Sequence, residues 1–209
     1  MDRYLFVPRV LRLIADGSTF RVGVALVLRT AAVGVALAAL VSWIGLWALA
    51  RYFEAAAVLG LVVFQALFVV ATYAIVHTIF IRAGEINRQP EGEFVILPIV
   101  ASCCRLLGEC LAWFFLALGV GGALLILLAG PYAQMATRQI PFSSLMSPGV
   151  GALGAVFYLA FGLVAAFAAV LFFYLVAEST SLLSAIARNT EVTRKAAERH
   201  GSTIASEPA

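Results

Sequence analysis

The chain has 209 residues, of which 63% are hydrophobic and only 12% are charged, and its formal net charge is +3. A soluble domain is roughly half apolar and about a quarter charged, so this composition excludes an ordinary water-soluble domain. It predicts an all-α integral membrane protein whose excess apolar side chains face lipid.

The first thirty residues predict a cytoplasmic amphipathic segment. Within residues 4–15, the stretch from Pro8 onward suits a short helix that has Arg9 and Arg12 on one side and apolar residues on another. Such a helix is expected to lie flat in the membrane interface. Arg9 and Arg12 are therefore candidate contacts to lipid headgroups or to a partner protein.

Four apolar runs in residues 31–177 are long enough to cross a bilayer, because a helix needs roughly 20 residues to span ~30 Å of hydrocarbon. The sequence predicts these spans at about residues 31–50, 55–81, 111–130 and 149–177. Only four residues separate the first two spans, which predicts a tight hairpin. Connections this short favour a compact antiparallel bundle.

Arginine and lysine are distributed unevenly around these spans. Twelve of the fourteen precede the first span, follow the fourth, or lie between the second and third, whereas Arg51 and Arg138 lie on the other side. Cytoplasmic segments carry an excess of these residues. The sequence therefore predicts a multi-pass protein of a bacterial inner membrane with both termini in the cytoplasm, the bacterial source resting on the Arg- and Ala-rich composition alone.

Residues 94–104 form an apolar stretch that is too short to cross a bilayer. We predict a re-entrant or interfacial helix that leads into the third span, with Phe94 and Pro98 among its contacts to lipid or a partner. The alternative is one tilted helix of more than 30 residues from about Pro98 to Gly130. Arg105 and Glu109 are four residues apart and could pair on one face of that helix.

Residues 178–209 predict a cytoplasmic helical tail. The helix is expected to run from Ala177 to about Arg199, and the last nine residues are expected to be disordered. Leu182 and Ile186 belong to a partial apolar stripe, which needs a partner surface or the lipid interface to cover it.

The second span carries the most polar side chains within the membrane domain. Four of them share part of the helix surface: Gln65, Thr72, Tyr73 and His77. They could line a polar path or a ligand site. The favoured interpretation is hydrogen bonding between helices, which contributes ~0.6 kcal/mol on average per bond in membranes.

Small residues four positions apart allow helix backbones to approach closely. Such pairs begin at one glycine of the first span, one of the third and two of the fourth. These candidate helix-packing residues are Gly34, Gly119, Gly151 and Gly162.

No motif points to catalysis. No Asp, Glu, Lys or Arg lies in the middle of a predicted span, which argues against an ion-coupled pump. His77 with Cys103, Cys104 and Cys110 could in principle bind a metal, but adjacent cysteines do not match the usual Cys-x-x-Cys spacing. We expect no enzyme activity, no cofactor, no metal site and no nucleic-acid partner.

These observations favour a non-catalytic subunit or scaffold of a larger inner-membrane complex. The alternative is an oligomeric pore or carrier for a small solute, lined by the second span, and a membrane enzyme or electron carrier is the least favoured function. The expected partners are membrane lipids, other membrane protein subunits, or further copies of this chain.

Overall fold

The computed structural model describes residues 18–89, 96–130 and 151–205. These residues form four long helices and one short 3₁₀ turn, and they contain no strand: α2 (Ser18–Leu49), η2 (Ala50–Tyr52), α3 (Ala55–Asn87), α4 (Ile96–Ala129) and α6 (Ala152–Ala205). All four long helices are long and apolar enough to cross a membrane. The all-helical class and the four candidate spans are therefore confirmed.

All four long helices reach further than the apolar runs suggested. α2 begins at Ser18, within the segment expected to be a separate cytoplasmic region, because residues 18–30 are mostly apolar and contain no helix-breaking proline. α3 continues to Asn87, beyond the expected end at 81. The interfacial helix predicted for residues 4–15 lies outside the described residues.

The separate helix predicted before the third span is not observed. Residues 96–104 are instead the first turns of α4, which runs without a break from Ile96 to Ala129, as the alternative interpretation had it. Pro98 does not interrupt it, because a proline in the first turn removes an N–H that has no partner within the helix.

α6 is a single helix of 54 residues. At 1.5 Å per residue it is about 80 Å long. The predicted tail helix is therefore present, as a continuation of the fourth candidate span. It extends to Ala205, so residues 201–205, which were expected to be disordered, are helical.

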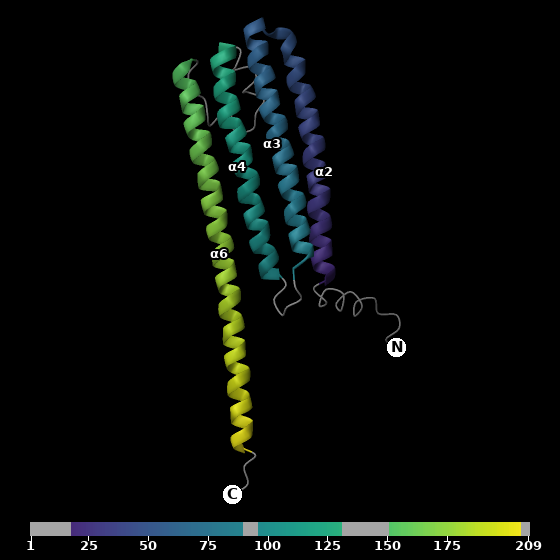
Figure 1. Ribbon diagram of the computed structural model, residues 1–209, viewed down its shortest axis with the longest axis vertical. Helices are drawn as coiled ribbons and strands as arrows, with labels where there is room; N and C mark the ends of the chain where they lie inside the picture. The colour runs from purple at the N-terminus through teal and green to yellow at the C-terminus, as the bar shows by residue number, and fades with distance from the viewer. Residues whose placement is uncertain (1–17, 90–95, 131–150, 206–209) are drawn as a thin grey trace, which may run out of the picture.

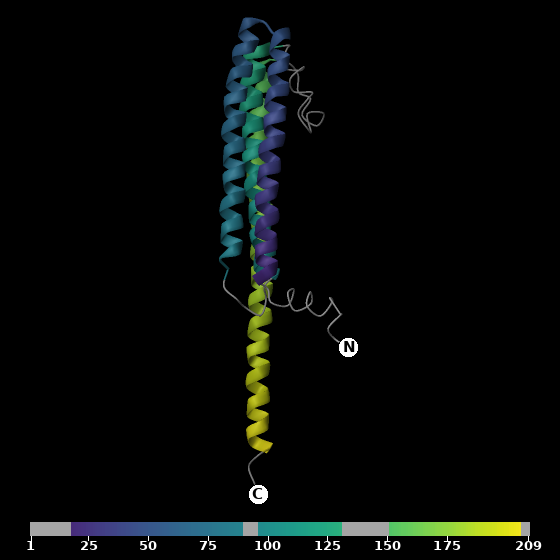
Figure 2. The ribbon, with the colours of Figure 1, turned by 90° about the vertical axis from the view of Figure 1, so that its right-hand side faces the viewer.

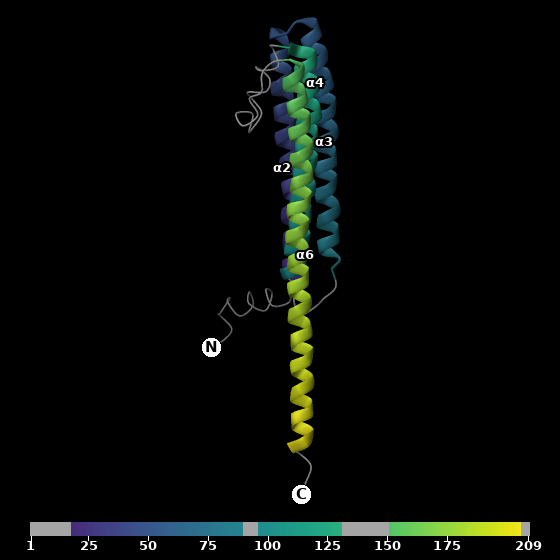
Figure 3. The same cartoon turned by 90° about the vertical axis from the view of Figure 1, so that its left-hand side faces the viewer.

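The long helices lie side by side in chain order (Figure 1). Extensive contacts join α2 to α3, α3 to α4 and, most of all, α4 to α6, whereas α2 and α6 have little contact. The expected compact bundle is thus only partly seen, because the first and last helices do not close it. Two opposite views, each turned by 90° from that of Figure 1, show α6 continuing alone past the other described helices (Figures 2 and 3).

We name the two ends of the structure by the residues found there. The Ser18 end holds the start of α2, the end of α3 and the start of α4, and it is the end past which α6 continues (Figure 1). The Tyr52 end holds η2, the end of α4 and the start of α6.

Two clusters of buried side chains form the core. The larger lies toward the Tyr52 end and takes residues from all four helices, including Leu46, Leu61, Leu125 and Tyr158. The smaller lies toward the Ser18 end, where Ala32, Ile79 and Leu106 join α2, α3 and α4.

Glycine sets the distance between α4 and α6. A Cβ atom built on Gly162 would lie 2.4 Å from the Cα of Gly119, so only glycine fits at this crossing. The predicted close packing at Gly119 and Gly162 therefore occurs within the chain. Neither Gly34, exposed on α2, nor Gly151, which has a φ of +107° before α6, has another atom within 4 Å of a built Cβ. These two glycines do not pack helices together in the described structure.

Candidate functional site

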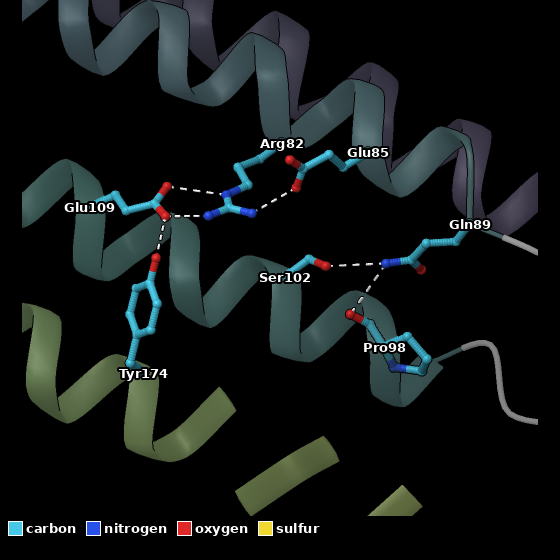
Figure 4. Close-up of polar contacts among 7 residues, drawn as sticks. All are labelled: Arg82, Glu85, Gln89, Pro98, Ser102, Glu109 and Tyr174. Carbon is cyan, nitrogen blue, oxygen red and sulfur yellow. Dashed lines mark hydrogen bonds and ion pairs between the residues drawn. The ribbon is translucent and has the colours of Figure 1, made fainter. Parts of the chain in front are cut away.

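A polar junction joins α3, α4 and α6 toward the Ser18 end (Figure 4). Arg82 of α3 donates from Nε to Oε2 of Glu109 on α4 at 3.1 Å, and its guanidinium makes a second, ion-paired contact with Oε1 of the same carboxylate. The hydroxyl of Tyr174 on α6 donates to Oε1 at 2.7 Å. One carboxylate thus receives hydrogen bonds from both neighbouring helices.

The two central charges of this polar junction, Arg82 and Glu109, are only slightly exposed and are paired with each other. The side chain of Arg82 is 19% exposed and that of Glu109 is 21% exposed. Glu85, one turn along α3, accepts a further hydrogen bond from Arg82 at 2.7 Å. Two carboxylates therefore surround one guanidinium, as partly buried charges require.

Arg105 extends the polar junction without joining its ion pair. Its guanidinium carbon lies 5.9 Å from the centre of the Tyr174 ring, within cation–π range. Its Nε is buried and has no hydrogen-bond partner among the described residues. The expected pairing of Arg105 with Glu109 is thus replaced by Arg82 pairing with Glu109, because α3 brings a second arginine to the same carboxylate.

A second set of polar contacts ties the ends of α3 and α4 together. Nε2 of Gln89 lies 3.1 Å from Oγ of Ser102 and 3.5 Å from the carbonyl oxygen of Pro98 (Figure 4). The backbone oxygen of Gln89 in turn accepts a hydrogen bond from the buried Arg21 of α2. This one glutamine therefore connects three helices at the Ser18 end.

The polar residues predicted to share one path on the second span point in different directions. Gln65 is buried, and its Nε2 donates to the backbone oxygen of Trp43 on α2 at 3.0 Å, an interhelical hydrogen bond of the predicted kind. Tyr73 and His77 are exposed and stack on each other, with ring centres 5.6 Å apart. Thr72 is partly buried and, seven residues after Gln65, lies on the same side of α3 as that residue. Within a single copy of the chain, these four side chains therefore do not line one path.

The cysteines are free and partly buried on α4. Among the described residues, no group of three or more His, Cys, Asp or Glu side chains is placed to hold a metal ion. His77 is exposed on α3, where it contacts Tyr73.

The candidate partner contacts of the tail are exposed. Leu182 and Ile186 are 64% and 62% exposed, on the part of α6 that follows Tyr174. Pro98 lies in the first turn of α4 and accepts the hydrogen bond from Gln89. Phe94, Arg9 and Arg12 lie outside the described residues.

Sequence reasoning placed Arg82 and Glu109 near the span boundaries but did not pair them. A signal for the pair was present, since opposite charges lie near the facing ends of two consecutive spans. The hydrogen bond from Tyr174 to Glu109 had no such signal in the sequence, because an aromatic residue in an apolar run is usually a packing residue.

No family model, curated protein or solved structure matches this chain. The functional argument therefore depends on the geometry of the chain itself.

Proposed function

We propose that this chain is a non-catalytic subunit or scaffold of a larger complex in a bacterial inner membrane, with its helices antiparallel and both termini in the cytoplasm. The uneven distribution of arginine and lysine supports this orientation, because it makes the Ser18 end the positively charged, cytoplasmic end. The polar side chains of the polar junction support a non-catalytic role, since they are occupied in joining helices.

The depth of the polar junction agrees with this orientation. Counting the roughly 20 residues that cross the hydrocarbon from the Tyr52 end leads to Glu109 on α4 and to within two residues of Tyr174 on α6. These two residues hydrogen-bond to each other, so they lie at one level. A polar level is expected where hydrocarbon gives way to headgroups.

The helices are longer than this membrane layer requires. α4 has 34 residues and is about 51 Å long, against ~30 Å of hydrocarbon and about 40–45 Å of whole bilayer. α6 continues furthest, because about 30 of its residues follow Tyr174. The proposed arrangement therefore has helix ends that extend into the cytoplasm.

These extensions expose several large apolar side chains, and this observation carries the proposal. Leu182, Leu183 and Ile186 on α6 and Ile96 on α4 are each at least 60% exposed. A group of large apolar side chains outside the lipid marks a protein contact. A subunit that docks through these helix ends accounts for them, whereas an isolated monomer leaves them in water.

Native mass, measured after extraction in mild detergent and with the co-purifying chains identified, tests the proposal. We expect the full-length protein to elute in an assembly larger than the monomer, and Leu182→Glu with Ile186→Glu to dissociate it. Arg188→Gln with Lys195→Gln is the matched control, because it lowers the net charge by the same two units on roughly the opposite side of α6. Monomeric wild-type protein, or equal behaviour of the two double variants, would contradict the proposal.

The alternative function, an oligomeric pore or carrier lined by α3, has one observation in its favour. Tyr73 and His77 are polar, yet they are exposed on the outer face of a candidate span. Polar side chains at membrane depth usually face protein or water rather than lipid. In an oligomer this face would meet another copy, so a homo-oligomer that loses solute flux in His77→Ala would support a pore over a scaffold.

A further inference from the structure

A groove opens between α2, α3 and α4, about midway along α3 and α4 and in the last third of α2. Its volume is about 460 Å³, which is within the range of ligand sites. All three helices contribute to its wall, including Ser42, Gly45 and Leu46 of α2, Phe68 and Thr72 of α3, and Phe114 of α4.

The groove exists because the core is interrupted there. The larger cluster ends around Leu46 and Leu118, and the smaller begins around Ala32 and Ile79. Between them α2 contributes small side chains, and a Cβ built on Gly45 would have nothing within 4 Å. α2 packs extensively against α3 alone among the long helices, so no other described helix fills the space.

The lining of the groove selects an apolar occupant. Aromatic and aliphatic carbons form most of the wall, and the hydroxyl of Ser42 is already bonded to the backbone oxygen of Ala38 at 3.0 Å. Water is stable in a cavity only where it finds two to four polar partners. Water is therefore a poor occupant, and an apolar chain is a good one.

We propose that this groove binds one hydrocarbon chain of a membrane lipid, which enters from the side between α2 and α4. The proposal depends on the membrane insertion proposed above, because the level of Gly45 and Phe114 then lies within the hydrocarbon and the surrounding lipid supplies the occupant. The bound chain would complete the packing of α2, which among the described long helices packs extensively only against α3.

The test uses the full-length protein in nanodiscs that contain a phosphatidylcholine with a photoreactive diazirine on its palmitoyl chain. We expect label at Leu118, which lines the groove but is only 5% exposed and so is screened from the surrounding lipid. Gly45→Phe places a ring where there is open space, and it should reduce the label at Leu118 at least fivefold. Ala117→Leu narrows the groove from the α4 side and should also reduce it.

Gly34→Phe is the matched control. Gly34 lies on the same helix, also has no atom within 4 Å of a built Cβ, and does not line the groove. Label at Leu118 should stay at the wild-type level in this variant. The proposal would be overturned if the label at Leu118 were unchanged in Gly45→Phe and Ala117→Leu. It would also be overturned if the wild-type protein carried no label at Leu118, which is the result expected where a helix of a second copy fills the groove.

The same experiment separates this site from membrane insertion itself. Phe157 and Phe167 on the outer face of α6 are 50% and 70% exposed. They should be labelled in every variant if the chain spans the bilayer. Label on α6 without label at Leu118 would refute the groove alone, whereas no label at either place would refute the membrane insertion on which the proposal depends.

Discussion

Replacing Gly162 by alanine should destabilise the protein through a single methyl group. The added Cβ would lie 2.4 Å from the Cα of Gly119 and 2.7 Å from the backbone oxygen of Phe115. Both are backbone atoms, so no side chain can rotate away. Ordinary contact begins near 3.4 Å, so α4 and α6 would have to separate by about 1 Å at this crossing.

The magnitude follows from the rigidity of that contact. Overpacking a well-packed core costs about 1–3 kcal/mol, and a clash between two backbones is expected at the upper end of this range. For a chain of about 200 residues, 3 kcal/mol corresponds to a decrease in Tm of about 6–12 °C. The effect arises within the chain, so we expect it in the monomer, before any effect on assembly.

Thermal unfolding followed with a thiol-reactive fluorophore measures this effect in detergent. Cys103, Cys104 and Cys110 are partly buried on α4 and become reactive when the helices separate. Gly34→Ala is the control, since its Cβ has open space and alanine favours the helix, so its Tm should be unchanged or slightly higher. If Gly162→Ala melts within about 1 °C of the wild type, the close approach of α4 and α6 is wrong.

Three further predictions concern polar contacts and topology. Tyr174→Phe removes one hydrogen bond and should lower the free energy of unfolding by about 1 kcal/mol. Glu109→Gln leaves Arg82 short of a countercharge and should lower the Tm further, and the double variant Arg82→Gln/Glu109→Gln should recover part of that loss. Gln65→Leu removes one interhelical hydrogen bond and should change stability by less than about 1 kcal/mol in the same melts, whereas a larger loss would indicate a role beyond packing. A fluorescent protein fused to the C-terminus should be bright and alkaline phosphatase fused there inactive, with the reverse at Arg51; the opposite pattern would invert the proposed orientation.

Helix existence was predictable from the sequence because each apolar run is longer than a bilayer crossing needs. Helix ends were less predictable, since hydropathy marks where lipid contact stops and not where backbone hydrogen bonding stops. α2 and α6 illustrate the difference: both continue through residues whose composition suggested a change of environment. Nothing in residues 18–30 or 178–205 breaks a helix, so the backbone continues.

Helix packing was predictable only in part. Small-residue spacing identified Gly119 and Gly162 correctly, but the same spacing at Gly34 and Gly151 has no close neighbour in the described structure. The pattern gives the capacity for close approach. Which glycine uses it depends on which helices lie adjacent, and that is a property of the whole arrangement.

The polar junction shows why contacts between the helices of a membrane protein are predicted from the depth of each residue as well as from its spacing in the sequence. Arg105 and Glu109 share one helix face, which suggested a pair along α4, but Arg82 reaches the same carboxylate from α3. Arg82 lies five residues before the end of α3 and Glu109 thirteen residues after the start of α4, so their meeting depends on the depth that each residue reaches and not on its distance along the chain. Depth matching of this kind pairs charges that composition alone leaves scattered, and it accounts for one polar level at the proposed cytoplasmic boundary. In the proposed orientation, the exposed apolar side chains beyond that level have no lipid to face, and for this reason we propose a protein partner for them.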